Sequence, residues 1–134
     1  GLADIIHFLN IWAKESTKVE DIFLVRYEDL KKTPAQTLRE LLDFMAVPVS
    51  EEHLQDAVEF SSYDNMKKME EKNASTASGG RLTPGDKDNP NSFKVRRAKV
   101  GGYRDYLEDD QVVVVDRIVA TTLDNRYGYG DSAR

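Results

Sequence analysis

The sequence contains no cysteine and only two histidines among its 134 residues. Without cysteine the protein forms no disulfide and offers neither a thiolate metal ligand nor a cysteine nucleophile. The two histidines, His7 and His53, are too few for a histidine-based metal site, so we expect no metal. The absence of cysteine also fits a cytoplasmic protein, because disulfides accumulate in oxidising compartments.

Long hydrophobic runs are missing as well. The longest, such as Val112–Val115, have four residues, whereas a membrane-spanning helix needs about 20. No basic segment followed by an apolar run opens the chain, so we expect neither a signal peptide nor a transmembrane segment. With 40% hydrophobic and 32% charged residues, the composition is that of an ordinary globular protein, and the length suits one domain.

Hydrophobic residues recur at helical spacing in several segments. The pattern predicts helices over residues 2–16, from Thr33 to Pro48, from Ser50 onward, from Ser61 or Ser62 to about Lys72, and over 108–124. Thr33-Pro34-Ala35-Gln36 also has the pattern of a capping box, in which the threonine and the glutamine side chains bond reciprocally to backbone N–H groups.

Only one segment predicts a clear strand. Ile22-Phe23-Leu24-Val25 is an apolar run of the kind found in strands that are covered on both faces of a parallel sheet. A strand must pair its backbone groups with a neighbour, and the rest of the sequence predicts none. We therefore expect either a part of a larger α/β fold or self-association through the unpaired strand.

The composition changes between Asn73 and Ser92, where Leu82 is the only large apolar residue. Loops of this length are usually functional or disordered, so residues 73–95 are predicted to form a flexible loop or lid. Gly80 and Gly85 have the spacing of a phosphate-binding loop, but Asp86 stands where lysine is required. We therefore exclude a P-loop here.

A basic segment follows, with five cations and no acid between Lys94 and Arg104, which gives +5 there and −10 elsewhere for a net charge of −5. Guanidinium groups and the accessible backbone N–H groups around Gly101-Gly102 are the donors that bind phosphate. The pattern is equally that of a solvated basic loop. Tyr103 and Tyr106 leave single-stranded nucleic acid as a third reading, but the acidic net charge favours no nucleic-acid partner.

Three segments, taken in order, resemble sulfotransferases that use 3′-phosphoadenosine 5′-phosphosulfate (PAPS), especially in their bacterial-type form. Phe23–Lys32 resembles the strand-to-helix segment of that family, and Phe60–Lys68 its next nucleotide-contacting segment. Arg96–Arg104 is similar to the family's phosphate motif, Arg-Lys-Gly-x-x-Gly-Asp-Trp-Lys. The similarity extends over roughly residues 8–123.

The resemblance implies a role for six residues in binding PAPS, with no metal. Tyr27 would border the adenine, the hydroxyl of Ser61 would bond to an adenine edge, and Met66 would pack against the ring. Arg96 and Arg97 would hold the 3′-phosphate, and the backbone at Ala98 would close around it. Ala98 stands where the family usually has glycine, which adds a methyl group and restricts positive φ.

The resemblance also implies a fold and an activity. The fold is α/β, a three-layer P-loop-NTPase-like sulfotransferase fold, of which residues 1–134 would be the mostly helical C-terminal portion of one domain with one clear strand. The family's phosphosulfate loop and catalytic histidine lie upstream, so we assign no catalytic residue and expect this chain alone to be inactive.

The complete enzyme would transfer a sulfuryl group to a hydroxyl or amine of a small-molecule or glycan acceptor. The alternative is a non-catalytic nucleotide-binding or assembly module from a truncated relative.

Overall fold

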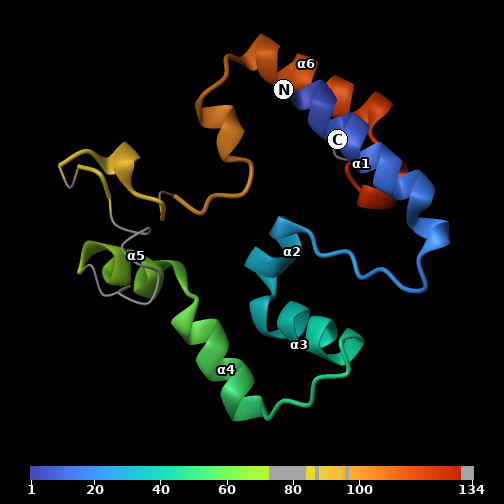
Figure 1. Cartoon of the computed structure of the whole chain (residues 1–134). Helices are drawn as coiled ribbons and strands as arrows, with labels where there is room; N and C mark the ends of the chain where they lie inside the picture. Colours follow the sequence, from blue (N-terminus) through green and yellow to red (C-terminus); the bar gives the residue numbers. More distant parts are fainter. Residues whose placement is uncertain (73–83, 87, 96, 131–134) are drawn as a thin grey trace. The chain divides into compact units, whose positions relative to one another are not determined.

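The computed structural model describes residues 1–72, 84–86, 88–95 and 97–130, which form two compact units. One unit comprises Gly1–Arg26 and Tyr103–Arg134, and the other comprises Tyr27–Gly102. Each is helical (Figure 1). No helix in the described ranges is long and apolar enough to cross a lipid bilayer.

The first unit is built on two long helices, α1 (Leu2–Glu15) and α6 (Asp109–Thr122), which lie side by side (Figure 1). The Asn10 side chain joins them, because its Nδ2 donates to the carbonyl of Thr122 at 2.7 Å and its Oδ1 accepts from the N–H of Asp124 at 2.8 Å. The hydroxyl of Tyr127, in the 3₁₀ turn Asn125–Tyr127, donates to the carbonyl of Leu9 at 2.6 Å. These bonds tie the C-terminal end of α6 to α1.

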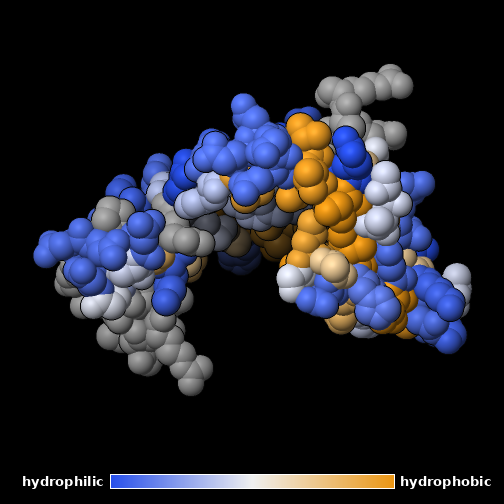
Figure 2. Space-filling model, turned by 90° about the horizontal axis from the view of Figure 1, so that it is seen from above, coloured by the Kyte–Doolittle hydropathy of each residue, from blue (hydrophilic) through white to orange (hydrophobic). Residues whose placement is uncertain are grey.

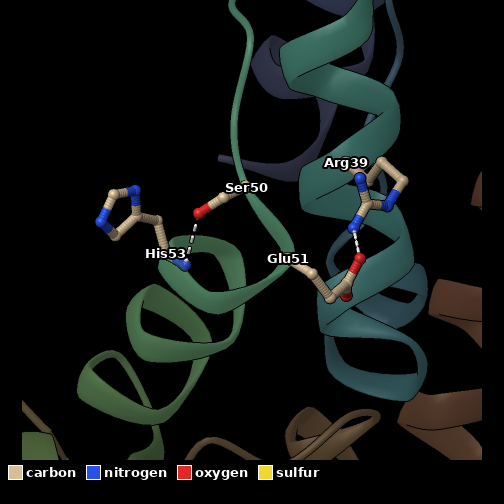
Figure 3. Close-up of polar contacts among 4 residues, drawn as sticks. All are labelled: Arg39, Ser50, Glu51 and His53. Atoms are coloured by element: carbon tan, nitrogen blue, oxygen red, sulfur yellow. Dashed lines mark hydrogen bonds and ion pairs between the residues drawn. The ribbon is translucent and has the colours of Figure 1, made fainter.

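The second unit contains α2 (Tyr27–Lys32), α3 (Pro34–Phe44), α4 (Glu51–Phe60), α5 (Tyr63–Glu71) and a 3₁₀ turn at Pro90–Ser92. Its helix starts follow local chemistry, since Ser50 and Ser62 accept the N–H groups of His53 and Asn65 at 3.2 and 3.3 Å. Leu54 on α4 is fully buried. An ion pair between Arg39 and Glu51 joins α3 to the first turn of α4 (Figure 3).

The expectation of a strand, and with it the predicted α/β class, is wrong for the described part of the chain. Residues 21–26 are neither helix nor strand, and no strand occurs elsewhere in the described ranges. Ile22, Leu24 and Val25 are 45%, 44% and 37% exposed. An apolar run forms a strand only where a second strand accepts its hydrogen bonds, and the described residues supply none.

The structure also corrects the start of α3. The side chain of Thr33 makes no cap bond and instead donates to the carbonyl of Asp29 at 3.3 Å, while Gln36 bonds to Glu40 at 2.9 Å. Thr33 directly follows α2, the helix of the strand-to-helix segment, and its hydroxyl bonds back into α2 and does not cap α3. The other predicted helices are confirmed, with Ser62 rather than Ser61 as the N-cap of α5.

Much apolar surface remains uncovered by the described residues, and Figure 2 shows hydrophobic side chains gathered in a band on one face. Ile5, Phe8 and Trp12 on α1 are 58%, 58% and 50% exposed, and Val113 and Val114 on α6 are 55% and 53% exposed. Soluble monomers rarely present large contiguous apolar patches, so exposed apolar surface gathered in this way is the type that another protein segment covers.

Candidate functional site

Two of the six predicted nucleotide-binding residues, Ser61 and Met66, lie at the junction of α4 and α5 and in α5 itself. The hydroxyl of Ser61, which ends α4, donates to the carbonyl of Val58 at 3.2 Å. Its proton is therefore engaged, and its oxygen can accept a bond from an amino group such as that of adenine. Met66 is half-buried in α5, one turn after the N-cap Ser62. Tyr27 begins α2 and is 47% exposed; within the described residues no hydrogen bond joins it to Ser61 or Met66.

The junction between α4 and α5 is fixed by Asn65. Its backbone N–H donates to the Ser62 hydroxyl at 3.3 Å, and its Nδ2 donates to the carbonyl of Phe60 at 2.7 Å. An open depression of about 410 Å³ adjoins this junction and is lined by three acids and one lysine, among them Asp56, Glu59 and Lys68. Such a lining repels an anion, so the depression does not suit a phosphate.

The segment that leads into the basic motif is anchored to α5 by a buried carboxylate. Glu70 is 3% exposed, and its two carboxylate oxygens accept the backbone N–H groups of Lys94 and Val95 at 2.6 and 2.8 Å. Lys67, one turn earlier on α5, lies over the Phe93 ring at 6.0 Å from its centroid. The backbone before the predicted phosphate ligands is thus held by α5.

Sequence reasoning missed Glu70, although a signal was present. Acidic residues are unfavourable in the last turn of a helix, where the dipole prefers cations, and α5 nevertheless ends with Glu70 and Glu71. A buried acid in that position needs a partner within the protein, and the backbone N–H groups of residues 94 and 95 supply it for Glu70.

The predicted phosphate segment has an unusual backbone. Ala98 has φ of +47° and Gly101 has φ of +68°, a left-handed conformation that glycine adopts easily and alanine rarely. Arg97 is exposed and lies in the same segment. Arg96 lies outside the described residues, as does most of the predicted loop 73–95. The left-handed backbone at Ala98 agrees with a position where the resemblance has glycine.

The C-terminal end of the basic segment belongs to the other unit and has a different partner. The Tyr103 hydroxyl and Arg104 Nη2 donate to the two carboxylate oxygens of Asp116, on α6, at 2.6 and 2.7 Å. The guanidinium of Arg104 also lies over the Tyr103 ring, 5.0 Å from its centroid. Arg104 is therefore engaged by an acid and not reserved for phosphate.

This cluster shifts two ionisation equilibria. The hydrogen bond from Tyr103, followed by that from Arg104, holds the pKa of Asp116 below its ordinary value. The same bond to Asp116, with a contribution from burial, raises the pKa of Tyr103 above its ordinary value. Both shifts favour the observed state, a phenol donating to a carboxylate.

An apolar cavity of about 480 Å³ lies beside this cluster, between α1 and α6. Leu2, Ile5, Val115 and Leu123 contribute to its lining. It offers few polar groups and does not suit a charged nucleotide.

Among the described residues, neither histidine is placed in a catalytic arrangement. His53 takes part in the α4 cap through its backbone N–H, and its imidazole points away from the Arg39–Glu51 pair (Figure 3). His7 is an exposed residue of α1. Among the described residues, no three histidine or acidic side chains are grouped so that they could hold a metal ion.

Comparison with known proteins agrees with the resemblance in the sequence. Cytosolic sulfotransferase 15 of Arabidopsis thaliana is 30% identical over 129 residues, which are 92% of this chain and 33% of that protein. Flavonol 4′-sulfotransferase of Flaveria chlorifolia is 24% identical over 87% of this chain and 36% of its own length. The chain thus spans about a third of these relatives.

No solved structure matches the chain. Residues 4–126 match the family described as the sulfotransferase domain. This match covers most of the chain, and the chain therefore belongs to the sulfotransferase domain family.

Proposed function

We propose that this chain supplies the adenine- and 3′-phosphate-binding part of a PAPS-dependent sulfotransferase. The observation that carries the proposal is the family match over residues 4–126. It is supported by the basic segment around Arg97 and by the left-handed backbone at Ala98, since phosphate binds where charged donors and accessible N–H groups converge.

In the proposed reaction, the acceptor oxygen or nitrogen forms a bond to sulfur while the bond from sulfur to the bridging oxygen of PAPS breaks. The acceptor's proton passes to a base, and 3′-phosphoadenosine 5′-phosphate (PAP) leaves with the bridging oxygen's electron pair. The part of this chain is to bind and orient the nucleotide, because correct positioning lowers the barrier to such a transfer. We propose no residue of this chain as the base, and we expect no turnover by the chain alone.

The names of the relatives bear on location and acceptor. Three Arabidopsis relatives are named cytosolic sulfotransferases, and two Flaveria relatives are named flavonol sulfotransferases. We propose a cytoplasmic location and a small-molecule acceptor with a hydroxyl group. The alternative is an acceptor that is a glycan or that carries an amine.

Thermal unfolding with nucleotides tests the binding part of the proposal. PAP at a hundred times its dissociation constant should stabilise the chain by about 2.7 kcal/mol, whereas 5′-AMP, which lacks the 3′-phosphate, should stabilise it much less at the same concentration. Arg97→Ala should remove most of this difference. Lys99→Ala removes one positive charge from the same segment and serves as the matched control.

The outcomes are distinct. Equal stabilisation by PAP and 5′-AMP contradicts a 3′-phosphate site in this chain. Equal losses in Arg97→Ala and Lys99→Ala indicate attraction by the general charge of a solvated basic loop. Turnover of PAPS by the isolated chain contradicts the expectation that it binds without catalysing.

A further inference from the structure

Glu70 is the only charged residue that is buried among the described residues, at 3% exposure. A buried carboxylate is costly unless hydrogen bonds compensate for its lost hydration. Here the compensation comes from two consecutive backbone N–H groups, those of Lys94 and Val95, at 2.6 and 2.8 Å. Charge-assisted bonds of this type are roughly twice as strong as neutral ones.

The position of these two bonds gives them a consequence for the basic segment. Two donors on one carboxylate fix the direction of the backbone as well as its position. Arg97 follows Val95 by two residues, so its Cα lies within about 7 Å of the anchored point, given the reach of an extended chain. The lysine–aromatic contact between Lys67 and Phe93 holds the same segment from the residue before.

We propose that Glu70 is a positioning residue for 3′-phosphate recognition. It acts through the backbone of Lys94 and Val95, which it holds on α5, and so sets where Arg97 and the left-handed Ala98 present their donors. This inference rests on the proposed function, since it assumes that a 3′-phosphate binds at Arg97.

Removal of the negative charge distinguishes positioning from simple electrostatics. Glu70→Gln keeps the size of the side chain but replaces one acceptor oxygen by a donor, which cannot accept an N–H bond. If only Coulomb repulsion acted, loss of a carboxylate near a phosphate site would strengthen anion binding. Positioning predicts the opposite sign. Glu71→Gln makes the same charge change at an exposed neighbour and is the matched control.

The experiment measures the affinities of the 134-residue chain for PAP and 5′-AMP by calorimetry, in the wild type, Glu70→Gln, Glu70→Asp, Glu71→Gln and Arg97→Ala. The readout is the ratio of the affinities for PAP and 5′-AMP. A general loss of stability lowers both affinities alike and leaves this ratio unchanged. We expect Glu70→Gln to lose about tenfold of this preference, the effect of one charge-assisted bond, and Glu71→Gln to retain it. Glu70→Asp keeps both carboxylate oxygens and should recover part of the loss.

Amide hydrogen exchange on the same proteins reports the anchor independently of binding. The amides of Lys94 and Val95 should lose protection in Glu70→Gln, while those of α4 keep theirs and show that the unit is folded. If Glu70→Gln unfolds α4 as well, Glu70→Asp is compared with Glu71→Gln instead. A preference for PAP that is reduced only in Glu70→Asp supports the inference, and equal preferences in the two variants overturn it.

An unchanged or higher preference for PAP in a folded Glu70→Gln overturns the inference. A wild type without preference, or a preference that Arg97→Ala does not reduce, means that the proposed function has failed here, and the inference fails with it even where exchange shows the anchor intact.

Discussion

Replacement of Ala98 by glycine should stabilise the protein, because the native backbone at this position is left-handed with φ of +47°. Left-handed backbone costs an L-residue about 1–2 kcal/mol and glycine almost nothing. Glycine also gives the unfolded chain more conformational freedom, which lowers the free energy of unfolding by about 0.4–1 kcal/mol. The net expectation for Ala98→Gly is a gain of about 0.5–1 kcal/mol in the free energy of unfolding.

The chain contains a matched control at Ala46, the other non-glycine residue with positive φ in the described ranges, at +54°. Ala46 directly follows Met45, the C-cap of α3, and its N–H and that of Val47 bond to the carbonyls of Asp43 and Leu42 at 3.0 and 2.9 Å. This is the left-handed helix ending that usually carries glycine. Ala46→Gly should therefore give a similar gain without touching the basic segment.

Urea unfolding followed by circular dichroism measures both variants. The midpoint should rise while the slope of free energy against urea stays constant, since the exposed surface does not change. Ala98→Val should destabilise, because a β-branched side chain tolerates the left-handed region least. A neutral or unfavourable Ala98→Gly beside a favourable Ala46→Gly would refute the left-handed conformation of Ala98 and with it the agreement with the family's glycine.

Two further predictions concern the units separately. Leu54→Ala should cost about 2–5 kcal/mol, because this side chain is fully buried in α4 and its loss leaves a cavity; Leu30→Ala, at a residue 41% exposed, should cost clearly less in the same urea assay. The Asp116 cluster should contribute stability between about pH 4 and pH 10, the ordinary pKa values of aspartate and tyrosine. Because the folded pKa of Asp116 is lowered, its contribution is lost as pH falls through that value; because the folded pKa of Tyr103 is raised, its contribution is lost as pH rises through it. The stability difference between the wild type and Asp116→Asn should therefore shrink at both ends, and a difference independent of pH would contradict the hydrogen-bonded cluster.

The helices could be predicted from the sequence because their signals are local. Hydrophobic spacing and a serine at the N-cap act within one or two turns, and Ser50 and Ser62 accept the bonds expected of caps. The strand failed for the complementary reason. Apolar residues at 22–25 indicate only that the segment needs cover, while its hydrogen-bond partners are decided by other parts of a chain. Self-association through that segment is untested and stays a prediction.

In the candidate site too, residues with a local sequence signal could be predicted and a residue whose partners are distant in the sequence could not. Residue types and motif order were enough to select Ser61, Met66 and Arg97, whose roles stay predictions. Glu70 could not be selected in this way, because its partners lie 24 and 25 residues further along the chain. Burial and hydrogen bonding over such separations depend on tertiary structure, and an acid at a helix end gives only a weak hint of them.

The basic segment looks uniform in the sequence, but in the structure two acids bind different parts of it, one the backbone and the other the side chains. At its start, the buried Glu70 accepts the backbone N–H groups of Lys94 and Val95. At its end, Asp116 accepts the side chains of Tyr103 and Arg104 themselves. Arg97, between these two anchored ends, is the residue for which we propose 3′-phosphate binding. Because Arg104 is bonded to Asp116, the number of cations in the segment overstates the number that we expect to bind phosphate. Asp116→Asn should therefore alter stability while leaving the preference for PAP unchanged.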